Sequence, residues 1–207
     1  SVGDATLLFD GSDVNLDTSA EHLQALTLSG LVTGGGGESP PSCAATFADD
    51  FETDDYTGST GSLAWSTDWL EVNESDGPGG GDEKVVSHAG DLAGRLKDNG
   101  SGSSGEGLER GADLSGYAAA TLTYSYWRTL GNNDSVTVQV SNNGGANWVQ
   151  LDLYAGPASD DDANPQSASY DITPYISPDT RIRFLTGTSN GNNDGIYIDD
   201  VEICLTN

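Results

Sequence analysis

The chain has 207 residues, 7 of them Lys or Arg and 33 of them Asp or Glu, which gives a formal net charge of -26 at pH 7. This charge disfavours nucleic acid and anionic membrane surfaces as partners and favours cations, either bound divalent ions or the salt of a halophilic setting. The length suits one β-sandwich with an extension, and no apolar run reaches the roughly 18 residues that a membrane-spanning helix needs.

The first 40 residues are expected to form an arm and a flexible joint. Two apolar stretches, 5–9 and 23–32, precede four glycines at 34–37 and two prolines. The arm is too small for a core of its own, so its large apolar side chains need burial elsewhere. These are Leu7, Leu8, Phe9, Leu26, Leu28 and Leu31. Donated as strands to neighbouring copies, they would join copies of the chain head to tail.

The two cysteines stand near the ends of the remaining sequence. Cys43 precedes the first strong strand pattern and Cys204 lies in the last one. First and last strands commonly pair in β-sandwiches, so we expect a Cys43 to Cys204 disulfide, with two buried free thiols as the alternative. The bridge implies an oxidising compartment. A chain that starts at Ser1, as after removal of a signal, agrees with a secreted or cell-surface protein.

From Thr46 onward the sequence is typical of an all-β fold. Short runs rich in Val, Ile, Thr and aromatic residues alternate with clusters of Gly, Asn, Asp and Ser. Residues 121–127 and 136–140 alternate apolar and polar side chains, as half-buried antiparallel strands do. The density of Gly leaves little room for helix. We therefore expect an antiparallel β-sandwich over residues 41–207.

Two groups of carboxylates interrupt apolar strands at opposite ends of this region. The early group is Asp49, Asp50 and Glu52, and the late group is Asp199 and Asp200. Carboxylates within apolar strands are costly without a counter-ion, and the disulfide would bring the two groups together. Several oxygen ligands suit calcium better than magnesium or zinc. The sequence predicts one calcium site here, with a solvated acidic edge as the alternative.

The early Asp-Asp-Phe-Glu, the Trp-rich segment after it and the terminal Ile-Asp-Asp-Val-Glu-Ile together resemble bacterial jelly-roll modules related to MAM domains and carbohydrate-binding modules. The resemblance covers roughly residues 46–205 and implies a jelly-roll fold. It also implies a structural calcium held by Asp50 or Glu52 and by Asp199 or Asp200. The arm has no counterpart in that family.

Two polar loops resemble known turn motifs. Residues 141–148 resemble an Asp-box hairpin, with Asn at the Asp and Thr places, so we expect a turn whose tryptophan folds back over it. Residues 190–195 resemble the opening of an EF-hand loop, but the twelfth place is Val201. Asn192 and Asp194 are therefore expected only in an irregular cation loop.

Trp65, Trp69 and Trp127 are candidates for stacking on sugar rings, and the alternative is that these rings pack in the core. For catalysis, His22 and His88 are the two side chains with an ordinary pKa near neutrality, and no Gly-x-Ser-x-Gly elbow occurs. We therefore expect no enzyme, and a small glycoside hydrolase is the remote alternative.

Two functions lead. The first is a non-catalytic extracellular binding or adhesion module with a structural calcium site and a glycan or cell-surface ligand. The second is a structural subunit of an extracellular filament or surface assembly, which binds copies of itself through the arm.

Overall fold

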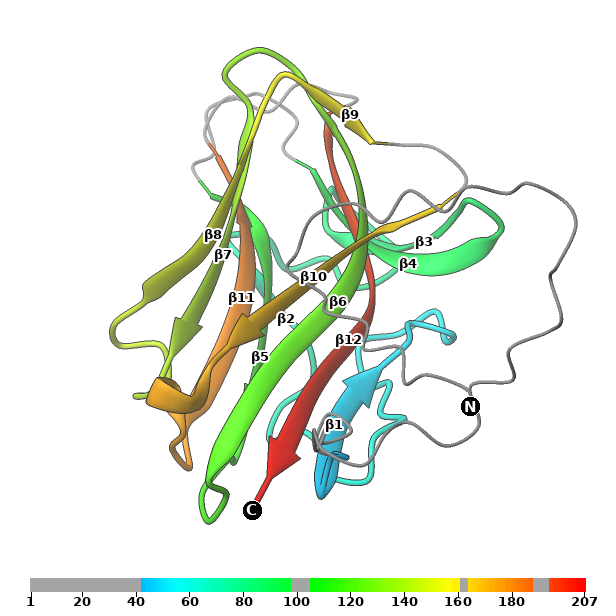
Figure 1. Ribbon diagram of the computed structural model, residues 1–207. Coiled ribbons are helices and arrows are strands. Elements are labelled where there is room, and N and C mark those ends of the chain that lie inside the picture. The colour runs from blue at the N-terminus through cyan, green and yellow to red at the C-terminus, as the bar shows by residue number, and fades with distance from the viewer. Residues whose placement is uncertain (1–41, 98–104, 161–163, 188–193) are drawn as a thin grey trace, which may run out of the picture. The chain divides into compact units, whose positions relative to one another are not determined.

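In the computed structural model the described residues are 42–97, 105–160, 164–187 and 194–207, and they form two antiparallel sheets packed face to face (Figure 1). The predicted all-β sandwich is confirmed. The chain divides between Ser39 and Pro40, and the described residues belong to the second unit. Within the described ranges no helix is long and apolar enough to cross a membrane. The six arm residues singled out above and Asn192 lie outside the described residues, so their roles stay predictions.

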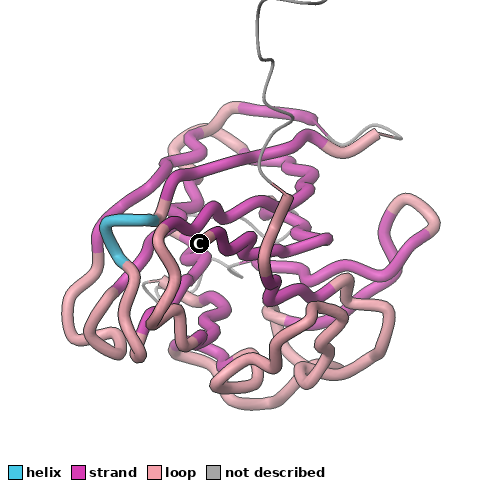
Figure 2. The backbone as a smooth tube through the Cα atoms, turned by 60° about the horizontal axis from the view of Figure 1, so that its bottom comes forward, coloured by secondary structure: helices cyan, strands magenta, loops and turns pink. Residues whose placement is uncertain are grey.

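The larger sheet has seven strands. Its order is β10 (Gln166–Asp171), β6 (Ala119–Leu130), β12 (Gly195–Thr206), β4 (Asp91–Lys97) and β3 (Lys84–His88), and β1 (Ala45–Asp49) pairs with β12 and β9 (Ala158–Asp160) with β6. The smaller sheet has the order β2 (Leu70–Val72), β5 (Gly107–Ala112), β11 (Thr180–Thr186), β7 (Ser135–Ser141) and β8 (Val149–Ala155). The one helical element described is the short 3-10 turn η1 (Thr173–Tyr175), cyan in Figure 2.

The core lies between the sheets and follows the predicted alternation. Leu122 and Tyr124 on β6 are buried, as are Val136, Val138 and Val140 on β7, whereas the residues between them are mostly only partly buried. Because successive side chains on a strand point to opposite faces, one set fills the space between the sheets and the other faces outward. The period of two was therefore a correct guide to the buried face.

Strand β12 lies inside the seven-stranded sheet, and one of its edges is shared by two partners. Ile198 is its last residue paired with β4, and Val201 is its first paired with β1. Between them the register against β6 shifts, and Asp200 has a positive φ of 49°. Such a bulge bends a strand and leaves its residues outside the regular ladder. Asp199 and Asp200 therefore stand where three strands meet.

The predicted disulfide joins the ends of the described unit. The Cys43 and Cys204 sulfurs are 1.96 Å apart, and the bridge closes a sequence separation of 161 residues. It ties the residues just before β1 to strand β12. Strands β1 and β12 themselves lie side by side in Figure 1. Closing a loop of this length stabilises by about 5 kcal/mol in the chain-entropy model.

Candidate functional site

Asp49, the first of the predicted calcium ligands, is part of a buried ion pair. Its side chain and that of Arg110 are each 1% exposed, and Arg110 Nη1 donates to Asp49 Oδ2. The same oxygen accepts from Trp69 Nε1 at 2.9 Å, and Oδ1 accepts from the Phe51 backbone N–H at 3.0 Å. Asp49 lies on the seven-stranded sheet and Arg110 on the other, so the pair links the two. The counter-ion that we expected for Asp49 from the sequence is the guanidinium of Arg110.

Arg110 is enclosed by rings and carbonyl groups. Its Nε donates to Thr67 O at 3.1 Å and its Nη2 to Gly58 O at 2.7 Å. Its guanidinium carbon lies 4.7 Å from the ring centroid of Trp65 and 5.5 Å from that of Trp69. A guanidinium with its donors used and rings over its planes is stabilised by both hydrogen bonds and cation–π attraction.

The predicted sugar-stacking platform is corrected by the burial of its rings. Trp65, Trp69 and Trp127 are 9%, 2% and 5% exposed. The first two pack around the buried ion pair, and Trp127 packs edge-on against His88 at 5.2 Å between centroids. His88 in turn stacks on Tyr197 at 3.8 Å. The alternative, that these rings pack inside the protein, therefore holds, because none of the three presents an open face to a ligand.

The other predicted carboxylates approach one another at the β12 bulge. Asp199 is 4% exposed, and burial raises its pKa to about 7, with the charges of Asp200, Asp91 and Glu52 adding to the rise. A hydrogen bond and the charge of Asp91 raise the pKa of Glu52 as well. Sequence reasoning missed Asp91, because nothing in its local sequence distinguishes it from the other acids. These mutually destabilising carboxyl groups are suited to a cation.

Two further predicted residues are only loosely connected with this group. Asp50 accepts a hydrogen bond from the Glu52 backbone N–H at 3.4 Å. Asp194 instead lies beside Asp134: burial raises the pKa of Asp194, and the Asp134 carboxyl adds to the rise. Asp194 therefore belongs to a different acidic pair.

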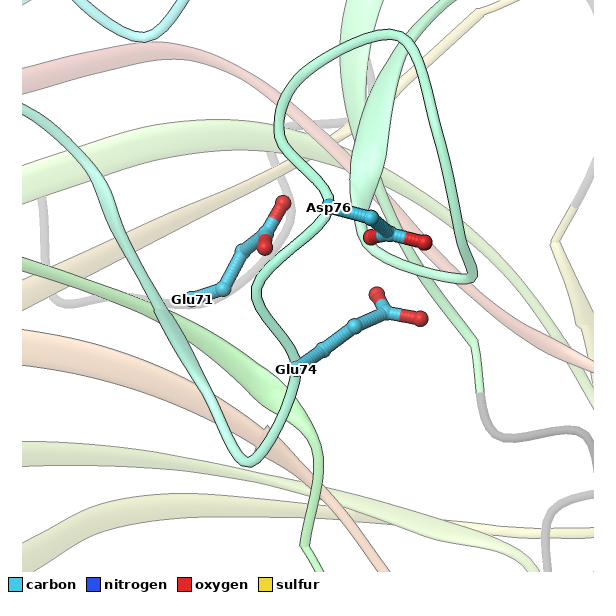
Figure 3. A group of neighbouring side chains, drawn as sticks. All are labelled: Glu71, Glu74 and Asp76. Carbon is cyan, nitrogen blue, oxygen red and sulfur yellow. The ribbon is translucent and has the colours of Figure 1, made fainter.

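A third acidic group was not predicted. Within the described ranges, the one set of carboxylates with an oxygen from each within 4.8 Å of the others is Glu71, Glu74 and Asp76 (Figure 3). Glu71 lies on β2, and the other two follow in the turn towards β3. The sequence does not distinguish these three acids from the others, because the chain has 33 Asp and Glu residues in all.

A polar row crosses the outward face of the five-stranded sheet. Glu109 on β5, Arg183 on β11 and Gln139 on β7 are directly opposite one another in register. Arg183 Nε donates to Gln139 Oε1 at 2.6 Å, and its guanidinium carbon lies 4.0 Å from the ring centroid of Trp148. Beside this row, Arg181 Nη1 pairs with Glu109 at 2.5 Å. Planar polar groups are thus held in fixed orientations on a solvent-facing sheet.

The Asp-box-like turn supports the middle of this row. Ser141 Oγ accepts from the backbone N–H groups of Asn143 at 3.2 Å and Gly145 at 3.0 Å. Gly144 and Gly145 have φ of 68° and 89°, which Gly adopts without strain. A Cβ on Gly145 would lie 3.2 Å from the Trp148 ring, so the ring closes over the turn as predicted. This places Trp148 against Arg183.

Comparison with known proteins finds similarity to solved structures alone. No family model matches the sequence, and no curated protein matches it. Similar solved structures include the K1 cleaved adhesin domain of Lys-gingipain from Porphyromonas gingivalis, with 16% identity over 78% of this chain and 98% of that chain and a TM-score of 0.48. A family 61 carbohydrate-binding module in complex with β-1,4-galactotriose has 15% identity over 75% and 94% of the chains and a TM-score of 0.47.

The CBM22-1 xylan-binding domain of Paenibacillus barcinonensis Xyn10C has 12% identity over 81% of this chain and 98% of that chain, with a TM-score of 0.47. All three TM-scores are below 0.5. The chain's class, an antiparallel β-sandwich, follows from its own strand order. The similarity to MAM domains remains a resemblance of short motifs.

Proposed function

We propose that this chain is a non-catalytic extracellular binding module that holds a glycan on the outward face of its five-stranded sheet. The observation that carries the proposal is the row of Glu109, Arg183 and Gln139. Sugar hydroxyls are both donors and acceptors, so neighbouring hydroxyls are matched by planar carboxylate, guanidinium and amide groups. Because Arg183 is held by Gln139 and Glu109 by Arg181, little conformational entropy is lost on binding.

Apolar surface beside the row suits the other side of a sugar. Leu153 on β8 is 47% exposed, and its register partner Thr137 lies next to Gln139 on the outward side of β7. The stacked pair of Trp148 and Arg183 adds a flat, amphipathic surface. Binding sites for small molecules combine apolar surface with a few well-placed polar groups. The face therefore offers both kinds of contact that a pyranose needs.

A structural calcium at the β12 bulge forms part of the proposal. Glu52, Asp91, Asp199 and Asp200 supply carboxylates there, and the buried Asp199 is the residue that gains most from a cation. Asp49 does not belong to the proposed set, because Arg110 already neutralises it. A calcium ion would hold the bulge where β12 passes from β4 to β1.

The extracellular setting and the non-catalytic role rest on separate observations. The Cys43 to Cys204 bridge supports an oxidising compartment. His88, the only histidine among the described residues, is packed between Tyr197 and Trp127 rather than presented at an open site. This packing favours a structural role for His88 over general acid–base catalysis.

The proposal is tested by glycan-array screening of the full chain, followed by titration of the best ligand. Arg183→Ala and Gln139→Ala are expected to weaken binding about tenfold or more, because each removes hydrogen bonds worth about 1.5 kcal/mol or more in a charged or coupled row. The matched control is Thr123→Ala, on the outward face of the other sheet. That face has a groove of about 350 Å³ lined by Thr123, Ser125 and Ser169.

Three outcomes would contradict the assignment. The array shows no glycan binding, both variants on the five-stranded sheet bind like the unmodified chain, or Thr123→Ala alone loses binding. The last result would move the ligand to the seven-stranded sheet. Circular dichroism and unfolding of each variant separate lost binding from lost fold.

The filament subunit is a second candidate, favoured by β8, which lies at the edge of the five-stranded sheet among the described strands. Strand β8 is an edge strand, and Val149 and Leu153 on it are 44% and 47% exposed. An edge strand with exposed apolar side chains is suited to receiving another strand. The apolar stretches 5–9 and 23–32 of a neighbouring copy are the proposed donors.

A further inference from the structure

The acidic group after β2 has the dimensions of a calcium site. Oxygens of Glu71, Glu74 and Asp76 all lie within 4.8 Å of one another. Two oxygens bound to the same calcium at about 2.4 Å are separated by at most about 4.8 Å. In Figure 3 the Glu74 and Asp76 carboxylates lie close together, and Glu71 reaches the same region from β2. One ion can therefore contact all three side chains.

The carboxylates are held in place by neutral donors. Glu74 Oε2 accepts from the backbone N–H groups of Glu83 at 2.9 Å and Asp82 at 3.1 Å. Glu71 Oε1 accepts from the Tyr56 hydroxyl at 2.9 Å. The ligand oxygens are thus positioned by groups that carry no charge.

A buried side chain beside the group is an independent sign of a missing cation. Glu83 is fully buried, and among the described residues neither of its carboxyl oxygens has a hydrogen-bond partner of normal geometry. Its carboxyl group interacts with the Glu74 side chain and therefore faces the acidic group. A buried carboxyl in this position requires either a proton or a cation.

Arg95, a basic residue beside the group, donates its hydrogen bonds to backbone carbonyls of the same loop. Arg95 donates from Nη2 to Gly81 O at 3.0 Å and from Nε to Asp82 O at 3.2 Å. Gly81 is at a φ of 61°, and a Cβ there would lie 2.3 Å from Glu74 Oε1 and 2.4 Å from Asp76 Oδ1. The glycine lets the backbone close around carboxylates that no arginine or lysine pairs with directly in the described residues.

We propose that Glu71, Glu74 and Asp76 bind a calcium ion of their own, with Glu83 behind them, at a site separate from the β12 bulge. The ion joins β2 of the five-stranded sheet to the turn that leads into β3 of the other sheet. It lies beside an open groove of about 300 Å³, lined also by Tyr56, Trp69 and Leu70. Calcium suits the site better than magnesium, because magnesium demands a tighter octahedron of oxygens at about 2.1 Å.

The test is calcium binding by the full chain, measured by isothermal titration calorimetry and by metal analysis after dialysis. Asp76→Asn is the main variant, because Asp76 is exposed and its loss should leave the fold intact. Glu71→Gln is the second. The matched control is Asp68→Asn, which removes the same charge from an exposed position just before β2. Glu52→Gln changes the β12 bulge instead, so it distinguishes calcium bound there from calcium bound at the site proposed here.

We expect the two site variants to weaken one calcium equilibrium about tenfold or more, while Asp68→Asn leaves it unchanged. The same equilibrium should persist in Glu52→Gln. A chain that binds no calcium overturns the proposal and leaves a proton on Glu83. Binding that responds to Glu52→Gln but to neither site variant overturns it as well. Terbium luminescence gives a second readout, because Tyr56 lies beside the ion and Tyr56→Phe should dim the signal of this site alone.

Discussion

Asp49→Asn should be among the most destabilising single substitutions in this chain. It removes the anion of an ion pair whose two side chains are each 1% exposed, and leaves the Arg110 charge buried. Asn has one acceptor oxygen, whereas Asp49 accepts from the Phe51 N–H on one side and from Arg110 and Trp69 on the other. Either orientation of the amide therefore sets its NH2 group against a donor. Breaking a buried pair in this way costs about 3–5 kcal/mol.

The assay is urea unfolding of the full chain in calcium and in chelator. The loss in Asp49→Asn should be the same in both, because the cation at Asp49 is a guanidinium. Glu52→Gln should behave in the opposite way, with little effect on stability in chelator. In calcium it should lose the stabilisation that the bound ion provides, which is about 2.7 kcal/mol when the calcium concentration is a hundred times the dissociation constant. An Arg110→Met variant and the double variant complete a cycle that isolates the coupling between the two residues.

Two results would refute this reasoning. A free energy of unfolding within about 1 kcal/mol of the unmodified chain would show that the pair is not buried as described. A loss that appears only in calcium would make Asp49 a calcium ligand, as the sequence alone suggested.

The pH dependence of stability reports on Asp199. The pKa of Asp199 in the folded chain, about 7, is above its value in the unfolded chain. Without divalent cations, the protonated Asp199 therefore contributes to the free energy of unfolding below about pH 4, and this contribution is lost as the pH rises towards 7. Asp199→Asn should remove this part of the slope, and parallel slopes in both proteins would contradict it. For the filament candidate, deletion of residues 1–36 should reduce assemblies to monomers in light scattering, and an unchanged size would exclude strand donation by the arm.

Local patterns explain what was predictable about the fold. The alternation in β6 and β7 identified the buried faces, because side-chain direction in a strand depends only on position along the chain. The Asp-box-like turn was also predictable, since its glycines and Ser141 interact within five residues. The disulfide followed from the positions of Cys43 just before the first strand and of Cys204 in the last strand.

The candidate sites were less accessible, because they depend on residues that are distant in sequence. Arg110 is 61 residues from Asp49, and no local feature marks it as the counter-ion. The buried pair also explains why Trp65 and Trp69 are internal rather than available to a sugar. Asp91 joins the bulge group only because β4 and β1 share one edge of β12.

The sequence by itself determined the class of fold, the bridge between Cys43 and Cys204 and the large excess of acidic over basic residues. Only the tertiary structure decided which acids are neutralised by arginine, which approach one another and which stay solvated. The reason is physical: a strand's periodicity is a local property, whereas the electrostatic environment of a carboxylate is set by every element packed around it.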